Sequence, residues 1–255
     1  MTRPRPPVPG APPVLPVAAV ARLRWREPPL RPVLTAEYVD LWRVCCPPGD
    51  VTLDHLTRLL TAEELGRADR FRFATDRRRF LVARGMLRLI VGRYLDRDPG
   101  LISFCQNAQG KPALDDPSGP HSLRFNLSHS HELILYAISH EREVGVDVEH
   151  MRPDFPALEV AARFFSPAEV QALSALDAAG RAEVFFAWWT AKEAYAKAQG
   201  HGLGADLPQL APAEEAGEPE GWRVHQLRPT PGYVAAVARE GPYTLRALSL
   251  SAARP

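Results

Sequence analysis

Two long helical segments, each flanked by short strand-like runs, constrain the fold of this chain most strongly. Residues 75–95 have the periodicity of an amphipathic helix with a basic first turn, and a second long helix is predicted from about 180 to 199. The flanking runs have the length and composition of strands, at 39–46, 101–105, 123–127, 132–139, 143–149, 222–227, 233–239 and 243–250. Strands, a helix and strands again in each half predict an α+β fold with mostly antiparallel sheets.

Two shorter helices are predicted from their capping sequences. Thr61 and Glu64 have the spacing of a capping box, which predicts a helix through about Asp69. Ser166 and Glu169 have the same spacing, and a proline stands between them at the first helical position.

Two segments have the composition of irregular chain. Residues 1–32 contain ten prolines, so we predict a flexible or polyproline-II leader and assign no role to it. Residues 208–221 are rich in Pro, Glu, Ala and Gly and are predicted to form an exposed loop.

Charge and cysteine content narrow the functional classes. The 255 residues carry a formal net charge of +1, which provides no basic field for nucleic acid or an anionic membrane. The apolar runs are too short to span a bilayer, and the N-terminus lacks the apolar core of a signal peptide. Three cysteines without metal-ligand spacing are typical of a reducing compartment. We therefore expect a cytoplasmic protein with no membrane or nucleic-acid partner.

A pair of carboxylates lies inside the predicted strand "GVDVE". Asp147 and Glu149 are two positions apart, so their side chains share one face of the strand and repel each other. Glu193, on the second long helix, offers a third acid, and three hard oxygen ligands suit Mg²⁺. The alternative is a solvent-facing pair, with Glu193 in an i,i+4 ion pair with Lys197. The tryptophans and alanines around Glu193 favour a buried helix that lines a cleft.

Basic and polar side chains form a second candidate group. Only three of the 31 basic residues are lysines, and Lys111, Lys192 and Lys197 all fall in sequence motifs. Each position is a candidate for a compact ammonium group, as phosphate sites often require, although chance is the alternative. The further candidates for binding phosphate are Arg72, Arg77, Arg78, Arg79, Ser128 and His129. Adjacent Ser128 and His129 do not indicate a hydrolase, because neighbours in a strand point apart and no nucleophile elbow is present.

The chain resembles the Sfp-type 4′-phosphopantetheinyl transferases in the order and spacing of five motifs. They are "GKP", "FNLSHS", "GVDVE", "RFFSPAE" and "FFAWWTAKEAYAKAQGHGL". The resemblance covers roughly residues 60–205. It implies transfer of the phosphopantetheine arm of coenzyme A to a serine of an apo carrier protein, with release of adenosine 3′,5′-bisphosphate. It also implies a pseudo-twofold pair of similar α+β halves, at 33–145 and 146–255, with coenzyme A between them.

The resemblance also implies roles for individual residues. Asp147, Glu149 and Glu193 would hold Mg²⁺ against the pyrophosphate, and Lys197 would lie against the phosphates. The implied coenzyme A contacts are Arg72, Arg79, Lys111, Ser128, His129, Asp147 and Lys197. The base that accepts the serine proton is Glu193 or a metal-bound water. Which of Arg77, Arg78 and Arg79 reaches the 3′-phosphate stays open.

Two other functions remain as alternatives. One is a metal-dependent phosphohydrolase, and the other is a non-catalytic module that binds a carrier protein or coenzyme A. For the leading hypothesis we expect a monomer that acts on an acyl or peptidyl carrier protein, and the sequence does not distinguish between these carriers. Because carrier proteins are usually acidic around their serine, Arg152 and Arg163 are candidates for the carrier contact, with ordinary surface arginines as the alternative.

Overall fold

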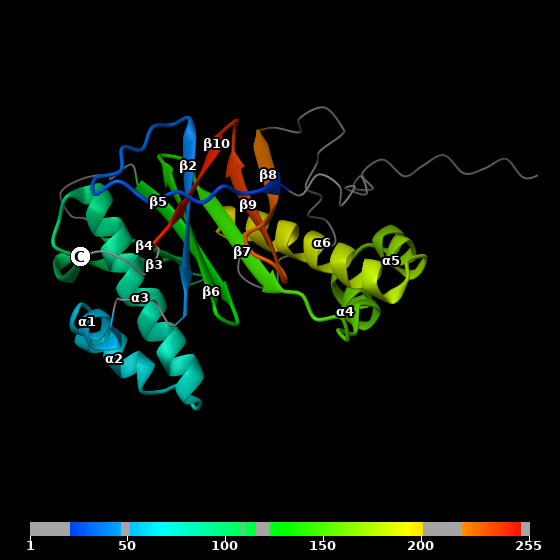
Figure 1. The fold of residues 1–255 in the computed structure, drawn as a ribbon, viewed down its shortest axis with the longest axis horizontal. Helices are drawn as coiled ribbons and strands as arrows, with labels where there is room; N and C mark the ends of the chain where they lie inside the picture. The colour runs from blue at the N-terminus through cyan, green and yellow to red at the C-terminus, as the bar shows by residue number, and fades with distance from the viewer. Residues whose placement is uncertain (1–20, 47–51, 109, 116–122, 201–220, 251–255) are drawn as a thin grey trace, which may run out of the picture.

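The computed structural model describes residues 21–46, 52–108, 110–115, 123–200 and 221–250. Within these residues two groups of helices stand on opposite sides of the strands (Figure 1). The prediction of an α+β fold with mostly antiparallel sheets is confirmed.

The described strands form two four-stranded sheets and one small hairpin. The first sheet has the order β10 (Thr244–Ser249), β2 (Tyr38–Cys45), β6 (Leu133–His140) and β5 (Leu123–Ser130). The second has the order β1 (Ala21–Arg22), β8 (Trp222–Arg228), β9 (Tyr233–Glu240) and β7 (Val144–His150). The hairpin pairs β3 (Phe104–Gln106) with β4 (Pro112–Leu114).

Each helical group contains one long helix. The first group is α1 (Leu53–Arg58), α2 (Ala62–Ala68) and α3 (Ala74–Leu95), followed by a 3₁₀ turn, η2 (Pro99–Leu101). The second group is α4 (Ala157–Phe164), α5 (Pro167–Ser174) and α6 (Ala178–Ala198). Both predicted capping boxes are present, at the starts of α2 and α5.

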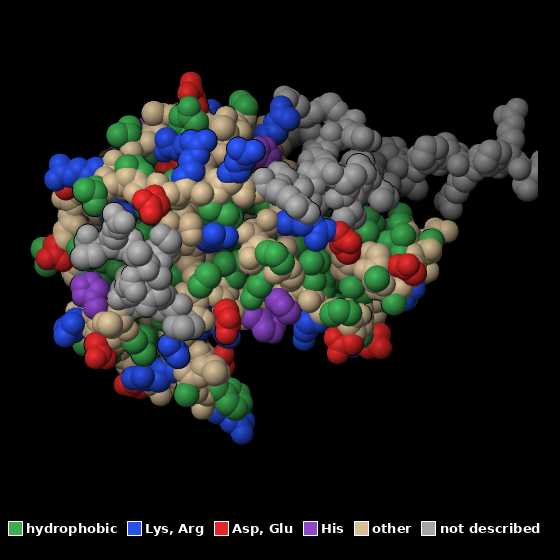
Figure 2. Space-filling model, in the orientation of Figure 1, with side chains coloured by type: hydrophobic (Ala, Val, Ile, Leu, Met, Phe, Trp, Pro, Cys, Tyr) green, Lys and Arg blue, Asp and Glu red, His purple; other side chains and the backbone are tan. Residues whose placement is uncertain are grey.

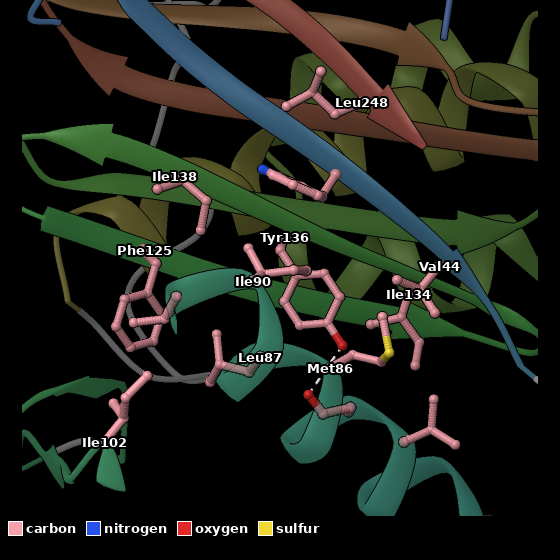
Figure 3. Close-up of a cluster of buried hydrophobic side chains, with 14 of the residues drawn as sticks. Val44, Met86, Leu87, Ile90, Ile102, Phe125, Ile134, Tyr136, Ile138 and Leu248 are labelled. Atoms are coloured by element: carbon pink, nitrogen blue, oxygen red, sulfur yellow. Dashed lines mark hydrogen bonds between the residues drawn. The ribbon is translucent and has the colours of Figure 1, made fainter. Parts of the chain in front are cut away.

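The layers follow the order α3, first sheet, second sheet, α6. Alternate residues of β6 separate two cores: Ile134, Tyr136 and Ile138 face α3, whereas Leu133, Leu135 and Ala137 face the second sheet. Figure 3 shows the first of these cores, where the Tyr136 hydroxyl donates to the Ala83 carbonyl at 2.9 Å. Val144, Val146 and Val148 of β7 face the same central core, so Asp147 and Glu149 point the other way, towards α6.

Each end of the described chain adds a strand to the sheet formed mainly by the other part of the chain. β10 pairs in parallel with β2 of the first sheet, and β1 pairs in parallel with β8 of the second. The division into halves at 33–145 and 146–255 stays a prediction. β7 already begins at Val144, and β10 satisfies the backbone groups at the edge of β2 that would otherwise be open.

Part of the predicted leader also packs on the folded body. The Trp25 indole donates to the Pro229 carbonyl at 3.0 Å, and Arg26 forms a parallel bridge with Leu248. Leu23 and Trp25 pack against the central core. Residues 23–26, within the predicted leader, thus lie against the sheets. Residues 1–20 and most of the predicted loop at 208–221 lie outside the described residues.

Two further properties of the described residues concern their helices and their surface charge. None of their helices is long and apolar enough to cross a membrane. In the face shown in Figure 2, basic and acidic side chains are interspersed.

Candidate active site

The candidate site lies where β5 and β7, the edge strands of the two sheets, run side by side (Figure 1). Alternate side chains of β5 reach across to β7. The contacts are Asn126 Oδ1 with the Val146 amide (2.9 Å), Ser128 Oγ with Asp147 Oδ1 (2.8 Å) and Ser130 Oγ with Glu149 Oε2 (2.9 Å). The sheets are thus joined by side chains at the position of the predicted carboxylates.

A glycine lets α6 approach this strand. A Cβ atom placed on Gly145 would collide with the Ala194 carbonyl oxygen and the Ala198 amide nitrogen. The first residue of "GVDVE" therefore has to be glycine for α6 to pack directly on β7. This close packing brings Glu193 and Lys197, on one face of α6, to Asp147.

The three predicted acids form one buried cluster. Asp147 and Glu193 are each 4% exposed, and Glu149 is half-buried. Burial raises the pKa of Glu193 to about 7; the Lys197 charge opposes this, and the charges of Asp147 and Glu149 add to it. Burial and the charge of Asp147 likewise raise the pKa of Glu149.

Lys197 is the cation of this cluster. Its ammonium group donates to Asp147 Oδ1 at 2.6 Å and to Ser128 Oγ at 3.3 Å. Lys197 therefore pairs across to β7, and the alternative of an exposed ion pair within the helix does not describe it.

The donor atoms suit a divalent cation. Asp147 Oδ2 and Glu193 Oε1 are buried and have no hydrogen-bond partner among the described residues. Buried unpaired carboxylate oxygens beside like charges are the ligands that Mg²⁺ prefers. In the part of the chain that the structure describes, however, no three His, Cys, Asp or Glu side chains already have the geometry of a metal site.

Arg79 and His129 lie on the side of the site next to α3. Arg79 Nε donates to the His131 carbonyl in the turn between β5 and β6, at 3.0 Å. Desolvation, followed by the charges of Arg79 and Lys197, lowers the pKa of His129, so these three side chains are neighbours. Because the His129 side chain is still accessible, solvent screens part of this lowering of the pKa. Arg72 is exposed, with its guanidinium over the Phe73 ring, and none of its printed contacts reaches the carboxylates.

Lys111 has acceptors in the second half of the chain. Its ammonium group donates to Glu143 Oε2 (2.6 Å) and to the carbonyls of Val144 (3.2 Å) and Ala198 (3.4 Å). It therefore joins the β3–β4 hairpin to the start of β7 and the end of α6. The phosphate contact of Lys111 stays a prediction.

Aromatic side chains contact one another next to the site, where β5 and β7 end. The rings of His131 and His150 lie 4.4 Å apart, and His150 meets Tyr233 edge-on at 4.8 Å. His131 adopts a left-handed backbone with φ of 50°. Figure 2 shows histidine side chains at the surface near the lower end of β7.

Sequence reasoning missed Asn126, Ser130 and Gly145. The signal for the first two was available, because they are two positions from Ser128 on the same strand and therefore share its face. The signal for Gly145 was weaker, since a glycine in a strand indicates a close backbone approach without saying to which element.

Comparisons with known proteins agree with this arrangement. Residues 46–141 match the family model "4′-phosphopantetheinyl transferase, N-terminal", and residues 143–238 match "4′-phosphopantetheinyl transferase superfamily". The 4′-phosphopantetheinyl transferase HetI of Nostoc sp. (strain PCC 7120) is 39% identical over 85% of this chain and 94% of its own length. Sfp of Bacillus subtilis (strain 168) is 31% identical over 60% of this chain and 65% of its own length.

The site is assembled from the facing edges of two sheets, and both parts of the chain match models of one class of group transferase. The chain belongs to the 4′-phosphopantetheinyl transferase superfamily, as an enzyme of the Sfp type. It transfers the phosphopantetheine group to carrier proteins, and the resemblance found in the sequence is confirmed.

Proposed function

We propose that the transfer depends on Mg²⁺ held by Asp147, Glu149 and Glu193, and that coenzyme A binds along the junction of β5, β7 and α6. The observation that carries the proposal is the buried acid cluster with two unpartnered oxygens beside Lys197. When bound, the ion would neutralise charge on the pyrophosphate. Without a divalent cation, the cluster contains three acids and only one ammonium group, that of Lys197.

The side chains divide the remaining work. The carrier serine oxygen attacks the phosphorus that bears the pantetheine arm, and the bond from that phosphorus to adenosine 3′,5′-bisphosphate breaks. Lys197, once released from Asp147, stabilises the negative charge of the leaving bisphosphate. Glu193, buried beside Asp147 and Glu149, is the proposed acceptor of the serine proton, and bound cation would keep it in the ionised form that a base requires. A water molecule is the alternative proton acceptor.

Binding of the adenosine end is proposed for residues of the first half. Arg79 and His129 are neighbours of Lys197, which supports contacts to the 3′-phosphate and the pyrophosphate. Ser128 already donates to Asp147 and lies between the acids and the basic side chains. Arg72 and Lys111 stay as proposals on the resemblance alone.

We further propose that the enzyme is a cytoplasmic monomer whose carrier-facing surface includes α4. Arg152 and Arg163 are exposed, and Phe164, which follows Arg163 in the sequence, is 37% exposed. An apolar side chain among accessible guanidinium groups suits an acidic carrier of the acyl or peptidyl type. Light scattering measures the oligomeric state, and a dimer would contradict that part of the proposal.

The test is intact mass spectrometry of apo carrier proteins incubated with the enzyme, coenzyme A and Mg²⁺. We expect a gain of one phosphopantetheine arm that is absent with EDTA. Asp147→Ala should abolish the gain while thermal unfolding stays cooperative, because the substitution removes one of three clustered acids and leaves the apolar cores intact. Full transfer by Asp147→Ala, or full transfer with EDTA, would refute the metal role. Cleavage of coenzyme A without carrier modification would indicate the phosphohydrolase.

A further inference from the structure

The three lysines of this arginine-rich chain all connect helix α6 to another element. Lys197 joins α6 to Asp147 of β7, and Lys111 donates to the carbonyl of Ala198, the last residue of α6. Lys192 joins α6 to Glu169 of α5. Two of these lysines belong to the proposed binding site, but Lys192 has no role in it.

The side chain of Lys192, on α6, is buried against α5. Its side chain is 1% exposed, and its ammonium group lies 3.0 Å from Glu169 Oε1. The ammonium group also lies 5.4 Å from the centre of the Phe165 ring. A buried ammonium beside a carboxylate and a ring face suits lysine, because the planar fork of arginine needs more room.

Glu169 acts on two elements at once. Its Oε2 accepts the Ser166 amide at 2.7 Å and so completes the capping box of α5, while Oε1 accepts from Lys192. The first turn of α5, itself fixed by the cap, thus holds one side of α6. On another side of the helix, Gly145 lets Ala194 and Ala198 contact β7.

The first half contains the same device in a different place. Glu64 completes the capping box of α2 and also accepts from the buried Arg88 of α3, at 2.8 Å. The acid at the third position of each short capped helix therefore pairs with a buried cation of the long helix. Only in the second half is the residue after that cation a site acid, Glu193.

We propose that the Lys192–Glu169 ion pair is a positioning device that fixes the rotation of α6, so that Glu193 faces Asp147 and Glu149. The proposal rests on the proposed role of Glu193. Consecutive residues of an α-helix point about 100° apart. A helix whose Lys192 is locked against α5 therefore has its Glu193 locked towards β7.

The test separates positioning from folding. Lys192→Met alone leaves the buried Glu169 carboxylate without its cation, so it should lower the melting temperature. The double variant Lys192→Met/Glu169→Gln removes both charges and keeps an oxygen for the Ser166 amide, so stability should recover. Because the double variant still lacks the ion pair between α5 and α6, we expect its Mn²⁺ affinity and kcat to fall by about tenfold or more, as for partners of metal ligands. The KM for coenzyme A should stay within about twofold, since the adenosine contacts are elsewhere.

The matched control is Arg88→Met/Glu64→Gln in the first half, which removes the equivalent pair from α2 and α3. Mn²⁺ affinity and kcat should stay within about twofold of the wild type in this control. An equal loss in both double variants, or wild-type Mn²⁺ affinity in Lys192→Met/Glu169→Gln, would overturn the proposal.

A third readout does not depend on the metal. If the wild type itself binds no Mn²⁺, the proposed metal role fails, and the crystal structure of Lys192→Met/Glu169→Gln decides the positioning role alone. We expect the Glu193 carboxylate to move by about 1 Å or more relative to β7, a displacement large enough to affect catalysis. An unmoved Glu193 would overturn the proposal.

Discussion

At the scale of single residues, the site concentrates negative charge in a place with little water. Asp147 and Glu193 are almost fully buried, and the only cation that an ion pair brings to them in the described residues is Lys197. Burial and the nearby like charges make ionisation of Glu193 costly, and its pKa is therefore raised. A divalent cation would reverse this by favouring the ionised form.

This cost predicts a pH dependence of stability in the metal-free protein. The pKa of Glu193 is about 7 in the folded chain against an ordinary value of 4.5, so between these values the folded state holds a proton that the unfolded state has released. The free energy of unfolding should therefore fall as pH rises from about 4.5 to 7. Urea unfolding at several pH values measures this slope.

Two comparisons control that measurement. Glu193→Gln should reduce the slope, because the variant has no carboxyl group to titrate at this position. Mg²⁺ with coenzyme A should also flatten it, because bound cation favours the ionised carboxylates. A slope that is the same in the wild type and in Glu193→Gln would contradict the burial of this acid.

The faces on which these side chains lie were predictable, because spacing along a strand or a helix decides which side chains share a face. Asp147 and Glu149 share a face of β7, and Glu193 and Lys197 share a face of α6, as their periodicities require. The pairing of Lys197 with Asp147 instead of Glu193 was not predictable, since it depends on how closely α6 packs on β7. Lys111 shows the same limit, because its acceptors lie 32 and more positions away in the sequence.

At the scale of elements, the contact between α6 and β7 places the acids together. Gly145→Ala should force these elements apart, because the added methyl group meets the backbone of α6. We expect a loss of about 1–3 kcal/mol in the free energy of unfolding, as for overpacked cores. Transfer should fall by about 10²-fold, because a shift of about 1 Å misplaces Glu193.

Gly66→Ala is the control for that substitution. Gly66 lies on the exposed face of α2, and a Cβ there would have no atom within 4 Å. This variant should gain about 0.5–1 kcal/mol from helix propensity and keep full transfer. Wild-type transfer by Gly145→Ala would show that the close contact is not needed for the site.

The elements themselves were predictable to different degrees. α3 and α6 are long and periodic, and their bounds agree with the prediction within about two residues. α1 and α4 were missed, because helices of six and eight residues show little periodicity and depend on packing against α3 and α6.

At the scale of the whole molecule, the ends of the described chain bind the halves together. β10 completes the first sheet beside β2, and the segment from β1 to Arg26 crosses from the second sheet to the first. Arg239, buried in β9 of the second sheet, donates to the carbonyl of Ala36 just before β2, at 2.7 Å. None of these contacts was predictable, because strand pairing across some 200 residues leaves no local pattern.

Trp25→Ala tests how much the N-terminal crossing contributes. The indole packs on the central core, donates to Pro229 and lies beneath the Arg43 guanidinium at 4.5 Å. We expect a loss of about 2 kcal/mol in thermal or urea unfolding, less than for a fully buried tryptophan. Arg24→Ala, at the exposed neighbouring position, should stay within about 0.5 kcal/mol of the wild type. Equal stability of the two variants would mean that the crossing does not stabilise the fold.

The most direct test of the account is a crystal structure of the enzyme with coenzyme A and Mg²⁺. We predict one cation among Asp147, Glu149, Glu193 and the pyrophosphate, with the Lys197 ammonium moved from Asp147 to a phosphate oxygen. A pyrophosphate bound away from β7, or Lys197 still paired with Asp147 and no cation beside the acids, would contradict the account.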